Sequence, residues 1–285
     1  MRASLRTVAA FANLSFKEAI RAKWLIIFTI VYFLVLVNIP FLILAVDGLL
    51  PPSSLNSYVV YLGSVSYPFL PLLSLPVGAL SIVEEKEAGT LQYLFSTRLT
   101  RFQFLLGRYL GMLLATSLVL LGGFAFAGLV VAFNANGQIL RDLGFEAGLA
   151  LLLNAIMLSL AITISALSRR KATALSIAIF TWFLLIILSD FGESFGLIVT
   201  LPNGPFAEVV AALINPIESA ALISEMSMNA YGPQLGPTVE ILKNYFGGPT
   251  TGIHTAMILM GLSLFGWLVI TVLMMFLAFK VMDLV

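Results

Sequence analysis

The chain has 285 residues, of which 60% are hydrophobic and 10% are charged, and its formal net charge is +1. A water-soluble domain usually has roughly 25% charged residues, so a mean hydropathy of +1.05 excludes a soluble globular protein. The balanced charge gives no basis for a nucleic-acid partner, and the absence of cysteine excludes disulfides and thiolate metal sites.

The first 23 residues, 1–23, predict an amphipathic helix. Apolar side chains such as Leu5, Val8 and Phe11 recur at helical spacing, and basic residues such as Arg6 and Lys17 lie between them. We expect this helix to lie in the membrane interface, where lipid headgroups hold its basic residues.

Six apolar stretches are long enough to cross roughly 30 Å of hydrocarbon as helices. They are residues 24–46, 58–83, 109–133, 147–167, 172–189 and 256–279, and none contains Asp, Glu, Lys or Arg. The sequence therefore predicts an all-α integral membrane protein, with residues 1–285 forming one membrane domain.

The positions of the basic residues predict the orientation of these spans. Of the 15 Lys and Arg residues, only Arg141 and Lys243 fall on one side, and the others fall on the opposite side. The positive-inside rule therefore places both termini in the cytoplasm, and we expect the protein in the plasma membrane. The acidic residues of the outer side are scattered, and we expect them to solvate that face.

The inner connection between the second and third spans, residues 84–108, is longer than a simple turn requires, and residues 84–99 form its first part. Three acids suited to the first turn of a helix precede apolar residues at helical spacing, and these residues are Glu84, Glu85, Glu87, Leu91, Leu94 and Phe95. The pattern predicts a short cytoplasmic helix, bent at Gly89, that docks into a groove on another protein.

This stretch resembles the coupling helix of permease subunits in the ABC-2 (type V) class of ABC transporters, which seats in a separate ATPase subunit. The matching positions are Glu84, Glu85, Glu87, Gly89, Thr90, Leu91, Leu94, Ser96, Arg101, Gly107 and Arg108. Residues 165–175, 215–217 and 279–284 are similar to the NosY-type branch of that class. The resemblance implies ATPase contacts from Glu84, Glu85, Glu87, Gly89, Thr90, Leu91, Leu94 and Phe95.

The resemblance also implies a set of partners. These are a second copy of the permease and two copies of an ATPase subunit that binds ATP and Mg²⁺. An extracytoplasmic protein, with which NosY-type members assist the maturation of a copper enzyme, is a further partner.

Residues 190–255 form an outer segment that is too long for a plain loop, so we expect it to fold. Residues 194–207 are apolar but interrupted by glycine and proline, which predicts a half-helix that dips into the membrane. Two further helical pieces are predicted at residues 208–226, with a break at Asn215 and Pro216, and at residues 239–246.

The sequence lacks several kinds of chemistry. It contains no G-x-x-x-x-G-K-[ST] motif, so we expect no enzymatic activity from this chain alone and ATPase activity in a partner. The predicted spans have no ionisable residues, which disfavours a secondary transporter. Met226, Met228 and His254 are the only candidate ligands for a soft metal, and we expect packing or interfacial roles for them and no metal site or other cofactor.

The sequence is compatible with three functions. A permease can export an apolar cargo along a dimer interface. A mechanotransmitter instead transmits motion to an external partner without moving cargo. A membrane scaffold or intramembrane enzyme outside the ABC class is the third alternative.

Overall fold

The computed structural model describes residues 2–47, 54–96, 100–132, 137–197, 204–228, 237–248 and 251–282. All regular structure within these ranges is helical. The helices are α1 (Arg2–Arg21), α2 (Lys23–Asp47), α3 (Ser54–Ser81), α4 (Val83–Glu87), α5 (Thr90–Ser96), α6 (Arg101–Ala132), α7 (Gly137–Leu167), α8 (Lys171–Leu197), α9 (Gly204–Ile214), α10 (Pro216–Met228), α11 (Pro237–Tyr245) and α12 (Thr251–Val281).

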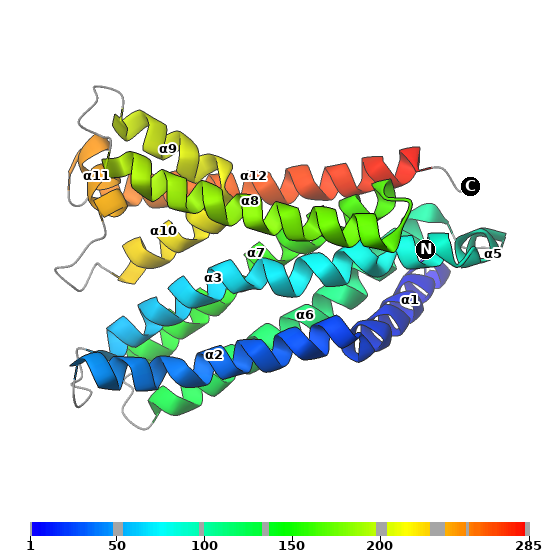
Figure 1. Ribbon diagram of the computed structural model, residues 1–285, viewed down its shortest axis with the longest axis horizontal. Coiled ribbons are helices and arrows are strands. Elements are labelled where there is room, and N and C mark those ends of the chain that lie inside the picture. The colour runs from blue at the N-terminus through cyan, green and yellow to red at the C-terminus, as the bar shows by residue number, and fades with distance from the viewer. Residues whose placement is uncertain are drawn as a thin grey trace.

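The long helices α2, α3, α6, α7, α8 and α12 coincide with the six predicted spans. Five described helices can cross a membrane by length and composition, and α1 with α2 forms a bent pair that passes the same criteria together. In Figure 1 the spans run side by side, with α1, α4 and α5 at one end of the bundle and α9 to α11 at the other. The prediction of an all-α membrane fold is confirmed.

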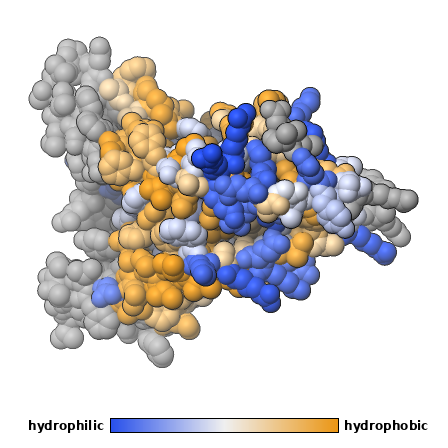
Figure 2. Space-filling model, turned by 45° about the vertical axis from the view of Figure 1, so that its right-hand side comes forward, coloured by the Kyte–Doolittle hydropathy of each residue, from blue (hydrophilic) through white to orange (hydrophobic). Residues whose placement is uncertain are grey.

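The surface follows the same division. Hydrophilic residues gather at the end that includes α1 and α5, and hydrophobic residues cover much of the adjoining face (Figure 2). The exposed apolar side chains of α8 and α12, such as Phe180 and Phe265, belong to faces suited to lipid or to another apolar protein surface. We call the two ends the α4 end and the α10 end.

Helix α7 lies at the centre of the bundle and packs against α3, α6 and α12. Buried polar contacts fix these neighbours: Asn154 accepts a hydrogen bond from Ser74 Oγ at 2.5 Å and donates to Thr116 Oγ1 at 2.9 Å. A further contact joins Ser159 Oγ and Thr271 Oγ1 at 2.7 Å. In an apolar medium such groups must find partners within the protein, so they set the register of the helices.

Helix α1 bends by 62° from α2 and packs along α6. A Cβ atom added at Gly111 would lie 2.2 Å from Ala12 O, and one at Gly107 would lie 2.8 Å from Phe11 Cβ. The backbones are therefore very close. Part of the apolar face that we expected to meet lipid, including the buried Val8, instead packs against the protein, whereas Leu5 stays exposed.

The segment predicted to lie on the outer side, residues 190–255, is mostly helical where the structure describes it. The break at Asn215 separates α9 from α10 as predicted, and α11 ends just before Gly247, whose φ of 109° only glycine adopts readily. The predicted half-helix at 194–207 is not a single element, because α8 continues to Leu197 and α9 begins at Gly204. Residues 198–203 lie outside the described part of the chain.

Two of the acids predicted to lie on the outer side are buried, which corrects the expectation that they solvate the surface. Glu146 is fully buried in α7 and accepts hydrogen bonds from Tyr67 Oη at 2.5 Å and Ser224 Oγ at 2.6 Å. Glu218 in α10 is also buried and accepts a hydrogen bond from Ser189 Oγ. Both carboxylates therefore connect helices that are distant in the sequence.

Candidate functional site

Helix α4 starts where the second predicted span ends. The backbone N–H groups of Ile82 and Val83 both donate to Ser165 Oγ on α7, at 2.9 and 3.0 Å. The first N–H groups of a helix have no partner within it, so this hydroxyl satisfies them from a neighbouring helix. The start of α4 is thereby fixed to α7.

The next residues of α4 contact the turn between α7 and α8. Lys86 Nζ donates to the carbonyl oxygens of Ala166 and Ser168, each at 3.0 Å, and so caps the end of α7. Glu87 Oε1 accepts the N–H of Lys171 at 3.2 Å, which places a carboxylate at the N-terminus of α8. Both contacts complement the helix dipoles.

Arg108 on α6 connects three elements. Its guanidinium lies 2.8 Å from Glu85 Oε1 on α4 and 2.5 Å from Glu18 Oε2 on α1, and it donates to Ser81 O at the end of α3 at 2.6 Å. The Arg108 side chain is 6% exposed. A charge at such a site is stable because it is paired and hydrogen-bonded. We call the contacts of Glu18, Ser81, Glu85, Lys86, Glu87, Arg108 and Ser165 the α4 junction.

Helix α5 follows α4 after a sharp bend. Gly89 adopts φ of 69°, a left-handed conformation that a residue with Cβ rarely takes, and this separates the two helices. The sequence predicted the bend at this glycine. Thr90 begins α5, and its hydroxyl donates to Glu85 O at 3.3 Å.

The apolar face of α5 packs on the chain itself, and the ATPase contacts expected of this stretch stay a prediction. Leu91 is 2% exposed, and Leu94 is half-buried against the same core. The Phe95 ring lies 5.5 Å from Phe104 and 6.1 Å from Phe279. Helical periodicity identifies an apolar face but not the chain that covers it, and in this structure the chain's own core covers Leu91.

The outward side of this region is polar or aromatic. Tyr93 is 75% exposed and projects from α5, and Gln92 and Thr90 are also exposed. Glu84 and Glu87 are exposed on α4. The exposure of Tyr93 could not be predicted from the sequence, because a single aromatic residue among apolar residues does not show which way it points.

A cavity of about 630 Å³ lies between the α1–α2 bend and α4. Acidic and basic side chains from five helices share it, including Glu18, Arg21, Glu84 and Lys171. Trp24 and Leu80 line its apolar part. The cavity borders the α4 junction, so a group that enters it meets the same charges that connect α1, α4 and α6.

The candidate metal ligands are not brought together in the part of the chain that the structure describes. Met226 is buried in the hydrophobic core, and His254 is exposed near the start of α12. The Met228 side chain lies outside the described residues. Among the described residues, no group of three or more His, Asp or Glu side chains is arranged to hold a metal ion.

Comparison with known proteins identifies the family. A sequence profile of ABC-2 family transporter proteins matches residues 9–284. The chain belongs to the ABC-2 family. This ABC-2 protein is a multi-pass membrane protein and a permease subunit of an ABC transporter, a class that works with an ABC ATPase.

Two relatives of this ABC-2 permease support the same assignment. It is 29% identical over 232 residues to a probable ABC transporter permease protein NosY of Stutzerimonas stutzeri. The aligned residues cover 79% of this chain and 83% of the relative. It is 31% identical over 187 residues to a probable ABC transporter permease protein NosY of Pseudomonas aeruginosa. That alignment covers 64% of this chain and 68% of the relative. The resemblance to the NosY-type branch is thereby confirmed.

Proposed function

We propose that this permease receives motion from a separate ATPase subunit at α4 and α5 and transmits it through the α4 junction to the membrane spans. The ATPase binds ATP and Mg²⁺, and this chain supplies the surface on which it docks. The observation that supports this most directly is the number of elements fixed to α4. Within five residues, α4 is bonded to α6, α7 and α8.

The α4 junction favours movement of these elements as one body. A force on α5 reaches α4 across Gly89, and the Glu85 contact with Arg108 then moves α6 and α1 with it. The Lys86 and Glu87 contacts move the ends of α7 and α8 in the same step. Close packing resists local deformation, so a displacement at this end shifts whole helices.

The buried contacts of Glu146 extend this path toward the α10 end. Tyr67 belongs to α3 and Ser224 to α10, so the carboxylate joins two spans to the outer segment. A tilt of α3 relative to α7 therefore displaces α10. This link supports a role in which the permease acts on an extracytoplasmic partner.

Two outputs fit this mechanism, and both belong to the proposal. The permease exports a cargo along an interface with a second copy of itself, or it transmits motion to an external partner without moving cargo. The similarity to proteins named NosY favours the second output. The exposed apolar faces of α8 and α12 are the surfaces available for the second copy.

The experiment compares two exposed tyrosines at opposite ends of the molecule. Tyr93 on α5 lies on the proposed docking surface, and Tyr245 on α11 lies at the α10 end. Tagged wild-type, Y93D and Y245D proteins are purified from native membranes, and bound subunits are identified by mass spectrometry. We expect the ATPase subunit with wild type and Y245D and its loss with Y93D.

The proposal is wrong if Y93D keeps a full complement of ATPase subunit together with wild-type ATP hydrolysis in the complex. L91D does not serve as this test, because Leu91 is buried and its substitution disturbs the fold. Loss of an extracytoplasmic protein from the same preparations after substitution in α10 would favour the transmitter output over export.

A further inference from the structure

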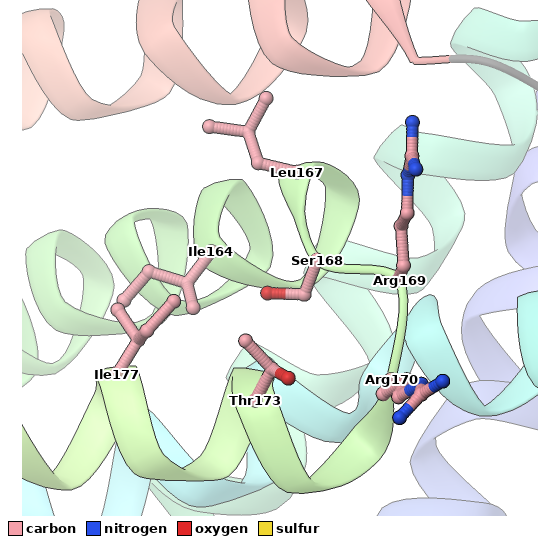
Figure 3. A pocket seen from close by; sticks show the side chains of 7 residues that line it. All are labelled: Ile164, Leu167, Ser168, Arg169, Arg170, Thr173 and Ile177. Atoms are coloured by element: carbon pink, nitrogen blue, oxygen red, sulfur yellow. The ribbon is translucent and has the colours of Figure 1, made fainter.

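The turn between α7 and α8 contains a second cavity, of about 530 Å³. Its lining combines hydroxyl, guanidinium and aliphatic side chains from the two helices: Ile164, Leu167, Ser168, Arg169, Arg170, Thr173 and Ile177. Figure 3 shows the Ser168 hydroxyl pointing into the space between Ile164 and Thr173, with Arg169 and Arg170 extending from the turn in different directions.

Ser168 is an anomaly at this position. The residue is 5% exposed, its N–H donates to Ile164 O at 3.0 Å, and its carbonyl accepts from Lys86 at 3.0 Å. Its Oγ atom is buried and has no hydrogen-bond partner within the described residues. Buried hydroxyls are nearly always bonded, so an orphaned hydroxyl that faces a cavity indicates a ligand that supplies the missing acceptor.

The charges around the cavity favour an anionic ligand. Arg169 and Arg170 are exposed, and neither side chain forms an ion pair or hydrogen bond in the part of the chain that the structure describes. They precede the N-terminus of α8, a helix of 27 residues whose dipole is positive at that end. The nearby carboxylates are already engaged: Glu87 with the Lys171 N–H, and Glu84 with Lys171 Nζ at 3.8 Å.

The aliphatic lining determines the type of anion. Leu167 is 63% exposed and Ile177 is 43% exposed, and both lie on the membrane-crossing helices next to the arginines. A free phosphate ion makes no use of such a surface, whereas the acyl chains of a lipid cover it. Phosphate oxygens are preferred acceptors for arginine and for serine hydroxyls.

We propose that this cavity binds the headgroup of an anionic phospholipid, with Ser168 Oγ donating to a phosphate oxygen, Arg169 and Arg170 pairing with its charge, and Leu167 and Ile177 contacting the acyl chains. The site lies beside the α4 junction, because Lys86 also contacts Ser168. A bound lipid therefore stabilises the turn to which α4 is fixed. The proposal does not depend on the ATPase docking surface.

The test uses the full chain, purified in detergent and stripped of lipid. Native mass spectrometry counts bound phosphatidylglycerol and phosphatidylcholine, and the melting temperature is followed with each lipid and with inorganic phosphate alone. The variants are R169Q/R170Q and S168A. R141Q is the matched control, since it removes an exposed arginine near the start of α7, at the opposite end of that helix.

We expect wild type and R141Q to retain phosphatidylglycerol in preference to phosphatidylcholine, and R169Q/R170Q to lose about tenfold or more in affinity for phosphatidylglycerol. S168A separates a ligand contact from a structural role. Removal of an unsatisfied hydroxyl raises the melting temperature of the lipid-free protein, but the further rise on adding phosphatidylglycerol should shrink.

Three results would overturn the proposal. The first is equal binding of both lipids to wild type. The second is stabilisation by inorganic phosphate as large as that by phosphatidylglycerol, which would assign the site to a free anion. The third is unchanged lipid binding in R169Q/R170Q together with loss of the ATPase subunit, which would assign the arginines to a protein contact.

Discussion

Arg108 Nη2 lies 2.8 Å from Glu85 Oε1, and the two side chains are 6% and 17% exposed. This ion pair joins α6 to α4, the helix that directly follows the second span. Because both groups are largely removed from water, loss of one partner leaves the other charge uncompensated.

R108Q therefore tests the junction. We expect it to lower the free energy of unfolding by about 3 kcal/mol, since it breaks a largely buried ion pair. E84Q, the control, removes a half-exposed carboxylate and should cost less than about 1 kcal/mol. Denaturant titration in detergent, followed by tryptophan fluorescence, measures both. An additive R108Q/E85Q double variant would show that the two residues are not coupled.

G111A tests the contact between α1 and α6. The added Cβ would lie 2.2 Å from Ala12 O, which is backbone and cannot move away without shifting α1. We expect α1 to separate from α6 and trypsin to cleave faster at Lys17 and Arg21. The control G261A has no atom within 4 Å of the new Cβ and should leave digestion unchanged. Equal resistance of G111A and wild type would contradict the close packing.

E146L tests the link to α10. It removes the carboxylate that accepts from the buried hydroxyls of both Tyr67 and Ser224, and we expect a loss of about 2–5 kcal/mol in the free energy of unfolding. Y67F/E146L removes one of the two orphaned donors and should recover part of this loss. E240L, at an exposed position near the same end, should change stability little. Equal melting temperatures of E146L and E240L would exclude a structural role for the buried carboxylate.

G89A tests the bend between α4 and α5. No atom lies within 4 Å of the new Cβ, so the substitution causes no steric clash with a neighbour. The cost comes from the φ of 69°, which should raise the free energy of the bent conformation by about 1–2 kcal/mol. We expect reduced ATP hydrolysis by the complex in G89A and near wild-type hydrolysis in G89N, because asparagine tolerates this conformation better. Proline cannot adopt this φ, so normal ATP hydrolysis by the complex that contains G89P would show that the bend has no part in coupling.

The spans and the position of α4 and α5 could be predicted because they depend on local properties. A run of about 20 apolar residues must form a helix in a bilayer whatever surrounds it. The contact of Glu146 with Tyr67 and that of Arg108 with Glu18 could not be predicted, because the partners are distant in the sequence. Glu146 and Glu18 are also residues that suit an exposed position. The small-residue spacing of Gly107 and Gly111 was a usable signal for a close helix contact, since two glycines four residues apart lie on one face.

The prolines of α3 have a consequence for the way this span deforms. Pro68, Pro71 and Pro76 lie inside the helix, and each lacks the N–H that would bond to the preceding turn. Bending at these points breaks fewer hydrogen bonds than bending elsewhere, and Pro76 is only a few residues from the start of α4. The helix that leads into α4 is thus also the one whose curvature changes at the lowest enthalpic cost.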